Sequence, residues 1–271
     1  MTIISKEIDA YYRNSDEQHR LFTGEGELER LRTQSILARN LPPAPAVIYD
    51  IGGAAGVYAF HLANQGYQVH LIDPVEPHIE QAKTHAVQSG IKLASISLGD
   101  ARHLNLDSGI ADAVLLLGPL YHLTDRSDRI LALKEAYRIL KPGGVIFAAG
   151  ISRFASFLDS LFHGTFKDAL FREIITGDLT TGQHRNPTDN PYYFTSAYLH
   201  LPEELKTEIN EAEFNQTRLL AVEGVAYNTA HFREIWDDPV QRNKLMEFLT
   251  KIEEEPSILG ASAHFIGVAY R

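Results

Sequence analysis

The chain has 271 residues, of which 44% are hydrophobic and 22% are charged, so it is long enough for one large domain with a full apolar core. Its formal net charge of −10 argues against nucleic-acid substrates, because binding to DNA or RNA usually requires a clustered basic excess. There is no cysteine, which excludes disulfides, thiolate metal sites and cysteine nucleophiles.

The N-terminal region is polar at first and then helical in pattern. Residues 1–20 lack the apolar segment of a signal peptide, and no stretch of the chain approaches the roughly 18 apolar residues of a membrane span. We therefore expect a cytoplasmic protein without membrane contact. Residues 28–40 predict a helix that ends before Pro42 and Pro43. Residues 1–44 are interpreted as a helical segment that covers a site on the rest of the chain.

Residues 45–151 alternate between strand-like and helix-like segments. The strand-like segments are rich in valine, isoleucine and leucine, as expected for strands that are buried on both faces. They lie at 47–50, 67–72, 92–98, 111–117 and 145–150. Helical patterns lie between them, with Gly66 and Gly90 as expected C-terminal caps. This alternation predicts a parallel sheet with right-handed crossovers.

The last third of the chain adds two strands and a long excursion. Segments 217–225 and 263–270 read as strands, so the fold class predicted is α/β, with a seven-stranded, mostly parallel sheet, helices on both faces and an antiparallel final strand. Residues 45–151 and 214–271 would form this core. Residues 152–213 begin with apolar, helically spaced residues and continue with turn-forming ones. An excursion this long is usually functional, so we expect a helical lid that binds substrate.

The segment VIYDIGGAAG at residues 47–56 places an acid next to a glycine-rich turn. Such a turn lets a ligand approach the backbone closely, and Asp73 at the end of the second strand is positioned for ribose hydroxyls. These two features do not distinguish a dinucleotide from another adenosine compound. Asp50 replaces the first glycine of the dinucleotide pattern, where it would repel a pyrophosphate but attract an ammonium group. Asp100, after the third strand, could accept a hydrogen bond from an amine such as that of adenine.

Five segments in order resemble the Rossmann-like (class I) S-adenosylmethionine-dependent methyltransferases. They are VIYDIGGAAG, LIDP (71–74), GDARHL (99–104), DAVLLLGPLYHL (112–123) and LKPGGVIF (140–147). The resemblance covers roughly residues 45–150, and the two final strands fit it as well. It implies that S-adenosylmethionine is the methyl donor and S-adenosylhomocysteine the product.

The resemblance also implies a set of cofactor-binding positions. Matched residue by residue, these are Asp50, Gly52, Gly53, Ala54, Gly56, Asp73, Pro74, Asp100, Ala101, Leu117, Gly118 and Arg32. The glycine turn would face the methionine part, with Asp50 near its ammonium and Arg32 near its carboxylate. Asp73 would hold both ribose hydroxyls, and Asp100 the adenine amine. The alternative for each acid is an ordinary helix cap or turn residue.

The chemistry of methyl transfer leaves few marks in a sequence. The transfer is an in-line displacement, and a general base is needed only if the nucleophile arrives protonated. The N/D-P-P-Y/F motif of enzymes that methylate planar amines is replaced here by GPLYHL at residues 118–123. Tyr121 and His122 are the candidate catalytic residues, because they would project near the methyl group and histidine can accept a proton near neutral pH. Simple packing of His122 ahead of Thr124 remains the alternative.

Substrate-binding candidates are Tyr11, Tyr12, His163 and Tyr193, with plain packing as the alternative for the two N-terminal tyrosines. No metal site is expected, because no carboxylate pattern frames His163 or His184. The leading hypothesis is a methyltransferase, monomeric or homodimeric, that acts on a small molecule at O, N or C. The alternatives are an RNA or protein methyltransferase, a module that binds the cofactor without turnover, and an NAD(P) oxidoreductase.

Overall fold

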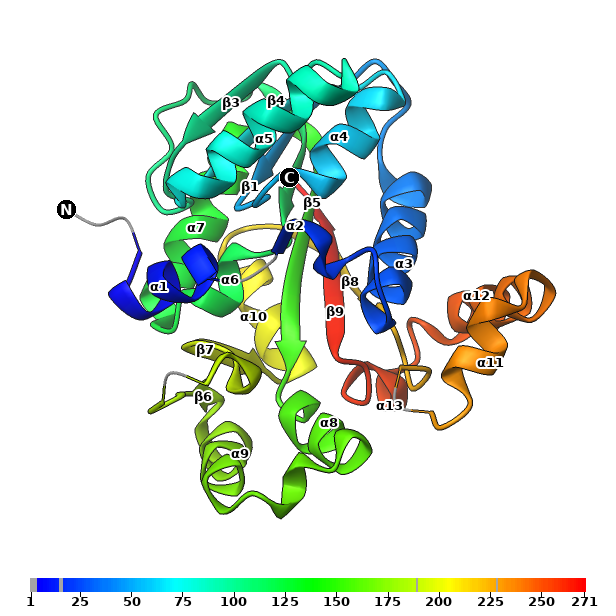
Figure 1. Ribbon diagram of the computed structural model, residues 1–271. Coiled ribbons are helices and arrows are strands. Elements are labelled where there is room, and N and C mark those ends of the chain that lie inside the picture. Colours follow the sequence, from blue (N-terminus) through cyan, green and yellow to red (C-terminus); the bar gives the residue numbers. More distant parts are fainter. Residues whose placement is uncertain (1–3, 15–16, 189, 228) are drawn as a thin grey trace.

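The computed structural model describes residues 4–14, 17–188, 190–227 and 229–271 (Figure 1). The strands are β1 (Val47–Ile51), β2 (Gln68–Asp73), β3 (Ser95–Leu98), β4 (Ala111–Leu116), β5 (Leu140–Ser152), β6 (Gln183–His184), β7 (Ala197–His200), β8 (Asn215–Ala221) and β9 (His264–Tyr270). The helices are α1 (Lys6–Asn14), α2 (Glu17–Arg20), α3 (Glu25–Asn40), α4 (Val57–Asn64), α5 (Glu76–Ser89), α6 (Pro119–His122), α7 (Arg126–Ile139), α8 (Ala155–His163), α9 (Ala169–Thr181), α10 (Pro202–Glu211), α11 (Phe232–Asp237), α12 (Pro239–Ile252) and α13 (Pro256–Leu259).

The central sheet has the strand order β3-β2-β1-β4-β5-β9-β8 (Figure 1). The pairs among β1 to β5 are parallel, whereas β9 is antiparallel to both β5 and β8. The predicted fold class, a seven-stranded and mostly parallel sheet with an antiparallel final strand, is therefore confirmed. Because the strand order reverses between β1 and β4, a crevice for a ligand is expected at their carboxyl ends.

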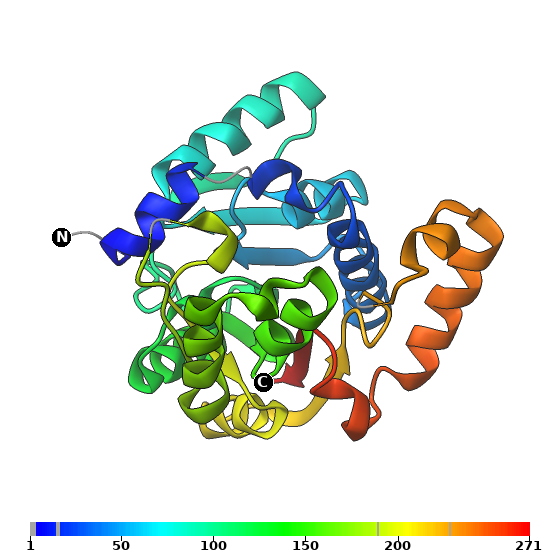
Figure 2. The ribbon, with the colours of Figure 1, turned by 60° about the horizontal axis from the view of Figure 1, so that its bottom comes forward.

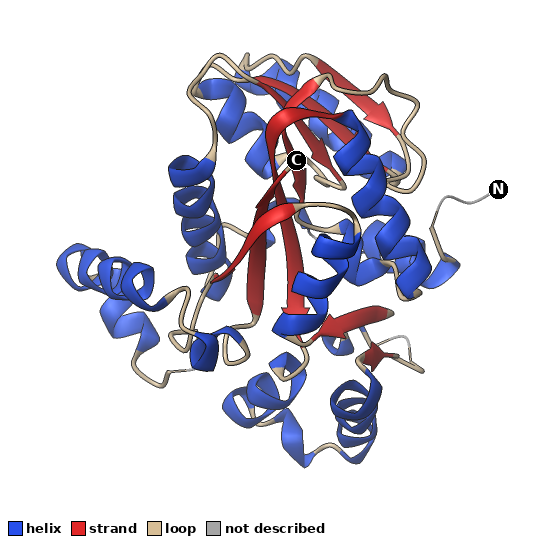
Figure 3. Cartoon of the chain, turned by 180° about the vertical axis from the view of Figure 1, so that it is seen from behind, coloured by secondary structure: helices blue, strands red, loops and turns tan. Residues whose placement is uncertain are grey.

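Helices cover both faces of the sheet, as Figure 3 shows from behind. Apolar residues of α3, α4 and α5 form one cluster with one face of the strands, and those of α7 and α10 form another with the opposite face. Along β4, Ala113 and Leu115 belong to the first cluster, while Val114 and Leu116 belong to the second. This alternation explains the continuous apolar runs in the sequence, since both sides of each central strand are buried.

The excursion after β5 has more structure than predicted. Its first half forms α8 and α9, as the apolar spacing predicted, but β6 and β7 then form a small antiparallel pair. Residues Leu199 and His200 of β7 pair with the end of β5, so this hairpin extends the sheet. The loop between β6 and β7 approaches the N-terminal region: residues 190–196 reach α1 (Figure 2), where Glu7 accepts a hydrogen bond of 2.5 Å from the Ser196 hydroxyl.

The range 152–213 predicted for the lid extends too far. Helix α10 lies within it, yet Leu205, Ile209 and Ala212 are buried in the same apolar cluster as α7 and the sheet. It therefore belongs to the core. The sequence does carry a signal for this helix, because PEELKTEINE begins with proline and two acids and spaces its apolar residues four apart.

Candidate functional site

A cavity of about 530 Å³ opens at the carboxyl ends of the parallel strands. The predicted site residues that line it are Tyr12, Asp50, Gly52, Gly53, Ala54, Asp73, Pro74, Asp100, Ala101, Leu117, Gly118, Tyr121 and His122. They come from α1, from the ends of β1 and β2, from the loops after β1 to β4 and from α6. The sheet brings these segments together because the ends of parallel strands all meet at one edge.

The turn after β1 is packed so closely that its glycines cannot carry side chains. Gly52 has a φ of +71°, and a Cβ atom there would lie 2.5 Å from the Pro119 ring. A Cβ on Gly53 would lie 2.5 Å from the Asp50 carboxylate, and one on Gly118 would lie 2.8 Å from the Gly52 carbonyl oxygen. Ala54 adopts a φ of +50°, which is uncommon for a residue other than glycine. The result is a concave stretch of backbone that faces the cavity.

Asp50 is a buried acid without a partner. Its residue is 1% exposed, and neither carboxylate oxygen has a hydrogen-bond partner among the described residues. Burial, with a smaller contribution from the nearby Asp73 charge, raises the pKa of Asp50 to about 7. A carboxylate held in this way is stabilised by any cation that enters the cavity.

Asp73 is also buried, but it is well supplied with partners. It accepts hydrogen bonds from the amides of Ala54 and Val75, both at 2.9 Å, and its Oδ1 atom lies 3.0 Å from Nδ1 of His78. A carboxylate has roughly four acceptor positions, so about one remains for a ligand. His78 was not predicted from the sequence; its Nε2 atom is buried and has no partner in the described part of the chain.

Asp100 is held by a neighbour that the sequence analysis also missed. The Arg102 guanidinium donates to both of its oxygens, with a shortest distance of 2.6 Å, and also to Asp128 at 2.6 Å. Burial by itself would raise the pKa of Asp100, but hydrogen bonds from Arg102 outweigh it and hold that pKa below its usual value. An adenine amine that binds Asp100 would therefore share it with Arg102. The close spacing of the two residues is a signal that was readable in the sequence.

Comparison with known proteins agrees with this geometry. A family model described as a methyltransferase domain matches residues 49–148, which include the glycine turn, Asp73, Asp100 and His122. Residues 49–148 therefore form a methyltransferase domain of the class I S-adenosylmethionine-dependent family. In this family S-adenosylmethionine is the methyl donor and S-adenosylhomocysteine is the product. The residues of this chain fit that cofactor, because a glycine-lined concavity lies beside a buried acid that lacks a cation.

Relatives with assigned names match only part of the chain. The ubiquinone biosynthesis O-methyltransferase of Caulobacter vibrioides is 29% identical over 116 residues, which are 43% of this chain and 45% of that protein. The protein of the same name from Methylocella silvestris is 33% identical over 106 residues, covering 39% and 40% of the two chains. This chain thus spans less than half the length of these relatives.

Solved structures share the fold over nearly the whole chain. A possible histamine N-methyltransferase from Thermotoga maritima covers 97% of this chain and 99% of its own, with a TM-score of 0.58 and 18% identity. Phosphoethanolamine N-methyltransferase 2 from Haemonchus contortus covers 99% of this chain and 60% of its own, with a TM-score of 0.60 and 15% identity. The [4+2]-cyclase SpnF has a TM-score of 0.57 and 17% identity, over 90% and 81% of the chains. At these identities the likeness concerns the fold alone.

In this methyltransferase fold, a tyrosine from α1 contacts the histidine after β4. The hydroxyl of Tyr12 lies 2.5 Å from Nε2 of His122, and the two rings meet edge to face. Burial lowers the pKa of His122 to about 4, so the ring is neutral at pH 7. Phe194 of the excursion lies against both His122 and Tyr11. Two segments far apart in the sequence therefore meet above His122, a contact that neither segment's own pattern reveals.

Arg32 does not have the position that was predicted for it. Its side chain is completely buried away from the cavity, where it pairs with Glu253 at 2.5 Å and donates to the carbonyl of Val222 at 2.9 Å. This arginine is therefore committed to holding α3 against the segments after β8 and α12, and the predicted contact with the cofactor carboxylate is wrong. Another arginine, Arg20, lines the cavity instead.

Four other predicted residues lie outside the cavity lining. His163 pairs with Asp159 at 3.4 Å on the surface of α8, and the Tyr193 hydroxyl donates to Asp168. Tyr11 packs against Tyr12 and Phe194, behind the residues that face the cavity. Gly56 has a φ of +88° and begins α4, so it shapes the turn without lining the cavity. The predicted substrate contacts of His163 and Tyr193 are not supported by these positions.

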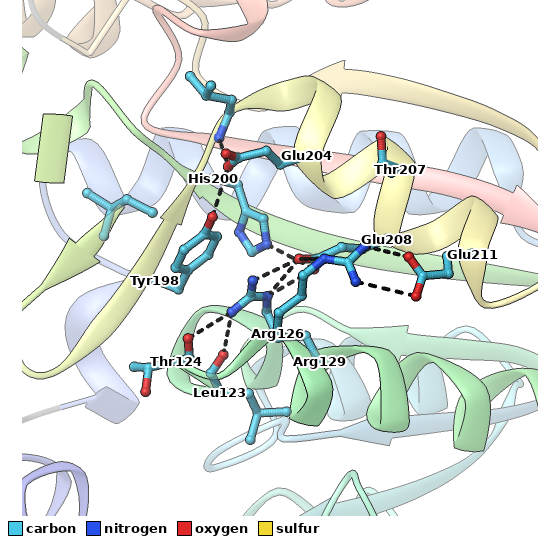
Figure 4. Close-up of polar contacts among 12 residues, drawn as sticks. Leu123, Thr124, Arg126, Arg129, Tyr198, His200, Glu204, Thr207, Glu208 and Glu211 are labelled. Atoms are coloured by element: carbon cyan, nitrogen blue, oxygen red, sulfur yellow. Dashed lines mark hydrogen bonds and ion pairs between the residues drawn. The ribbon is translucent and has the colours of Figure 1, made fainter. Parts of the chain in front are cut away.

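A buried ionic network lies under the segment that carries His122 (Figure 4). Arg129 of α7 pairs with Glu208 of α10 at 2.7 Å and also donates to the carbonyls of Leu123 and Thr124, at 2.9 and 3.1 Å. Its guanidinium lies 3.8 Å from the ring centre of Tyr198 in β7. Arg129 thus joins the end of α6 to the core and to the hairpin of the excursion, which fixes the backbone beside His122.

Proposed function

We propose that the protein transfers a methyl group from S-adenosylmethionine to a small molecule whose nucleophilic atom loses a proton at the Tyr12–His122 pair. The single observation that carries this proposal is the position of that pair. It lines the same cavity as the glycine turn and Asp50, and the N-terminal helix α1 and Phe194 of the excursion lie against it. A covered cavity favours a small acceptor over a polymer.

The cofactor supplies a methyl group activated by a sulfonium. The glycine turn offers close backbone contact, and Asp50 supplies the negative charge that a bound ammonium group needs. The covering by α1 and Phe194 excludes water and restricts the orientation of the acceptor. Holding the nucleophile in line is the main contribution expected from this chain.

The proton of the acceptor can be moved by the two side chains together. The neutral His122 ring has a free lone pair at one nitrogen, and its Nε2 atom is within hydrogen-bond distance of the Tyr12 hydroxyl. The acceptor would give its proton to the Tyr12 oxygen while Tyr12 gives its own proton to Nε2. A positioned acid–base group typically contributes about 10²- to 10⁴-fold in rate, and the lower end of that range is expected here because a pKa of about 4 makes His122 a weak base at pH 7.

The names of the relatives support a small-molecule acceptor but do not select one. They include enzymes named for O-methylation in ubiquinone biosynthesis and for N-methylation of phosphoethanolamine. RNA or protein methylation is disfavoured by the net charge of −10 and by the covered cavity. A reaction other than methyl transfer is the alternative, because one structure with this fold is named a cyclase.

The first experiment is titration calorimetry with S-adenosylmethionine, S-adenosylhomocysteine and NAD(H), followed by measurement of S-adenosylhomocysteine release with a panel of phenols, amines and phosphorylated amines. We expect binding of the first two ligands only, and turnover with at least one acceptor class. Binding of NAD(H) alone would overturn the proposal.

The role of the pair is tested with Tyr12→Phe and His122→Gln. Both should reduce kcat by at least about 10²-fold while the affinity for S-adenosylhomocysteine changes little. The matched control is Tyr192→Phe, because Tyr192 is 90% exposed and does not line the cavity. Unchanged kcat in both pair variants would mean that the acceptor arrives without a proton to lose, and it would refute the proposed relay.

A further inference from the structure

The wall of the cavity beyond β5 carries charged residues that the proposed reaction does not use. His264 begins β9 and pairs with Ile151 at the end of β5. It lines the cavity together with Arg20 and Glu29. In the sheet order, β9 lies two strands from β4, which is roughly 10 Å at the usual strand spacing. These residues therefore lie on the side of the cavity away from the adenosine-binding positions at β2 and β3.

His264 is held in one orientation by a buried carboxylate. Glu223 is 3% exposed, and its Oε1 atom lies 2.7 Å from Nδ1 of His264. Its Oε2 atom accepts hydrogen bonds of 2.9 Å from the Ser262 hydroxyl and from the His264 amide. Both oxygens of the carboxylate thus accept hydrogen bonds, which fixes its orientation. The other ring nitrogen of His264, Nε2, has no hydrogen-bond partner among the described residues.

The charges around His264 come from three elements. Glu223 follows β8, Glu29 lies on α3, and Arg20 ends α2. Arg20 donates to both oxygens of Glu29, at 2.6 and 3.2 Å, so this pair carries no net charge. Burial alone would lower the pKa of His264, but the carboxylates of Glu223 and Glu29 outweigh burial and Arg20 and raise that pKa to about 9. At pH 7 the ring is therefore an imidazolium that offers an N–H donor.

We propose that His264, oriented by Glu223 and assisted by Arg20, binds an oxyanion of the methyl acceptor, such as a carboxylate or phosphate. This inference rests on the proposed function, because it assigns the far end of the same cavity to the acceptor. A bound oxyanion would supply the missing partner of Nε2, and the Arg20 guanidinium keeps the nearby Glu29 carboxylate neutralised so that it does not repel the anion. It adds a specificity contact at a distance from the Tyr12–His122 pair.

A divalent cation is the less suitable occupant of this wall. Ligand atoms of Glu29, Glu223 and His264 do lie within 4.8 Å of one another. However, both oxygens of Glu29 are occupied by Arg20, and both oxygens of Glu223 accept hydrogen bonds. The positive charges that balance these acids are already present in the protein.

The test uses acetate as the probe and the full chain labelled with ¹⁵N in its histidines. The His264 ring signals are assigned from their loss in His264→Gln, and acetate is titrated into the free protein, its 5′-methylthioadenosine complex and its S-adenosylhomocysteine complex. We expect a saturable shift of the His264 signals in all three. His231→Gln is the matched control, because His231 also pairs with a glutamate, Glu234, but is exposed.

Two results would overturn the inference. One is the absence of a saturable shift in every form of the protein. The other is a shift that occurs with 5′-methylthioadenosine but is abolished by S-adenosylhomocysteine, since the carboxylate of the cofactor would then occupy His264. If neither nucleoside binds, the proposed function fails, while the titration of the free protein still reports on the oxyanion site.

The pH dependence of the wild type gives a second measurement that needs no variant. Because the imidazolium is lost as the pH rises through about 9, acetate affinity should be constant at pH 7–8 and fall about tenfold per unit above 9. Glu223→Gln should weaken acetate binding at pH 8 by roughly ten- to a hundredfold, the usual range for a charge-assisted hydrogen bond. An affinity that is the same at pH 8 and 10.5 would show that the imidazolium does not bind the anion.

Discussion

Replacement of Asp50 by asparagine should affect stability and cofactor binding in opposite directions. In the free protein the carboxylate is buried without a partner, and its pKa rises from 3.8 to about 7. At about 1.4 kcal/mol per pH unit, this rise corresponds to about 4 kcal/mol of destabilisation above pH 7. The free protein should therefore become more stable in Asp50→Asn. The variant should also bind S-adenosylhomocysteine more weakly, because the ligand's ammonium group loses its acid.

The sign of the pH dependence follows from the raised pKa. Wild-type stability is unaffected by this group below pH 3.8, the pKa of an unperturbed carboxyl, and it declines as the pH rises from there to about 7. At pH 5 the destabilisation is only about 1.6 kcal/mol, whereas at pH 8.5 it is about 4 kcal/mol. The buried amide of asparagine also lacks partners, which reduces the net gain to about 1–3 kcal/mol at pH 8.5.

The assay is urea denaturation of the free wild type and variant at pH 5 and 8.5, combined with calorimetric titration of S-adenosylhomocysteine. The quantity compared is the free energy of unfolding of the variant minus that of the wild type. We expect this difference to be about 2–3 kcal/mol larger, in favour of the variant, at pH 8.5 than at pH 5. Asp237→Asn, at an exposed position, serves as the control. A variant that is no more stable at pH 8.5 and binds the ligand as tightly as wild type would refute the reasoning.

Two further predictions concern packing around the site. Gly53→Ala should lower S-adenosylhomocysteine affinity by at least tenfold in calorimetry, because the new Cβ atom would lie 2.5 Å from the Asp50 carboxylate. The control is Gly177→Ala within α9, where the new Cβ atom would make only an ordinary contact at 3.4 Å, so binding should be unchanged. Equal affinities in the two variants would contradict the close packing of the turn. Arg129→Met should destabilise the protein by about 3–5 kcal/mol in urea denaturation, because it leaves Glu208 charged and buried. Adding Glu208→Leu to this variant should restore a large part of the lost stability. A double variant no more stable than the single one would show that the ion pair is not the cause.

The sequence predicted the elements whose signals are local. A helix that ends at the cap Gly90 was predicted, and the structure has α5 at Glu76–Ser89 followed by Gly90 at a φ of +72°. The strands of the sheet lie within a few residues of their predicted positions, apart from an earlier start of β5. Hydrophobic periodicity and glycine caps depend on neighbouring residues alone, so one chain is enough to read them.

The predictions that failed depend on partners far away in the sequence. Arg32 was assigned to the cofactor, but its partner Glu253 is 221 positions away and holds the side chain outside the cavity lining. Helix α10 was placed in the lid because no local feature shows which apolar faces pack against it. Strand β7 was missed because it is short and its pairing with the end of β5 is the reason it forms.

By itself, the sequence determined the fold class, the glycine turn and the acids at or just after the ends of three strands. These features are set by local spacing and by the backbone freedom of glycine, which no later contact changes. Only the tertiary structure brought Tyr12 to His122 across 110 positions, and Glu223 to His264 across 41. Their effects on pKa and orientation arise from burial and from short distances, and a linear sequence contains neither quantity until the chain has folded.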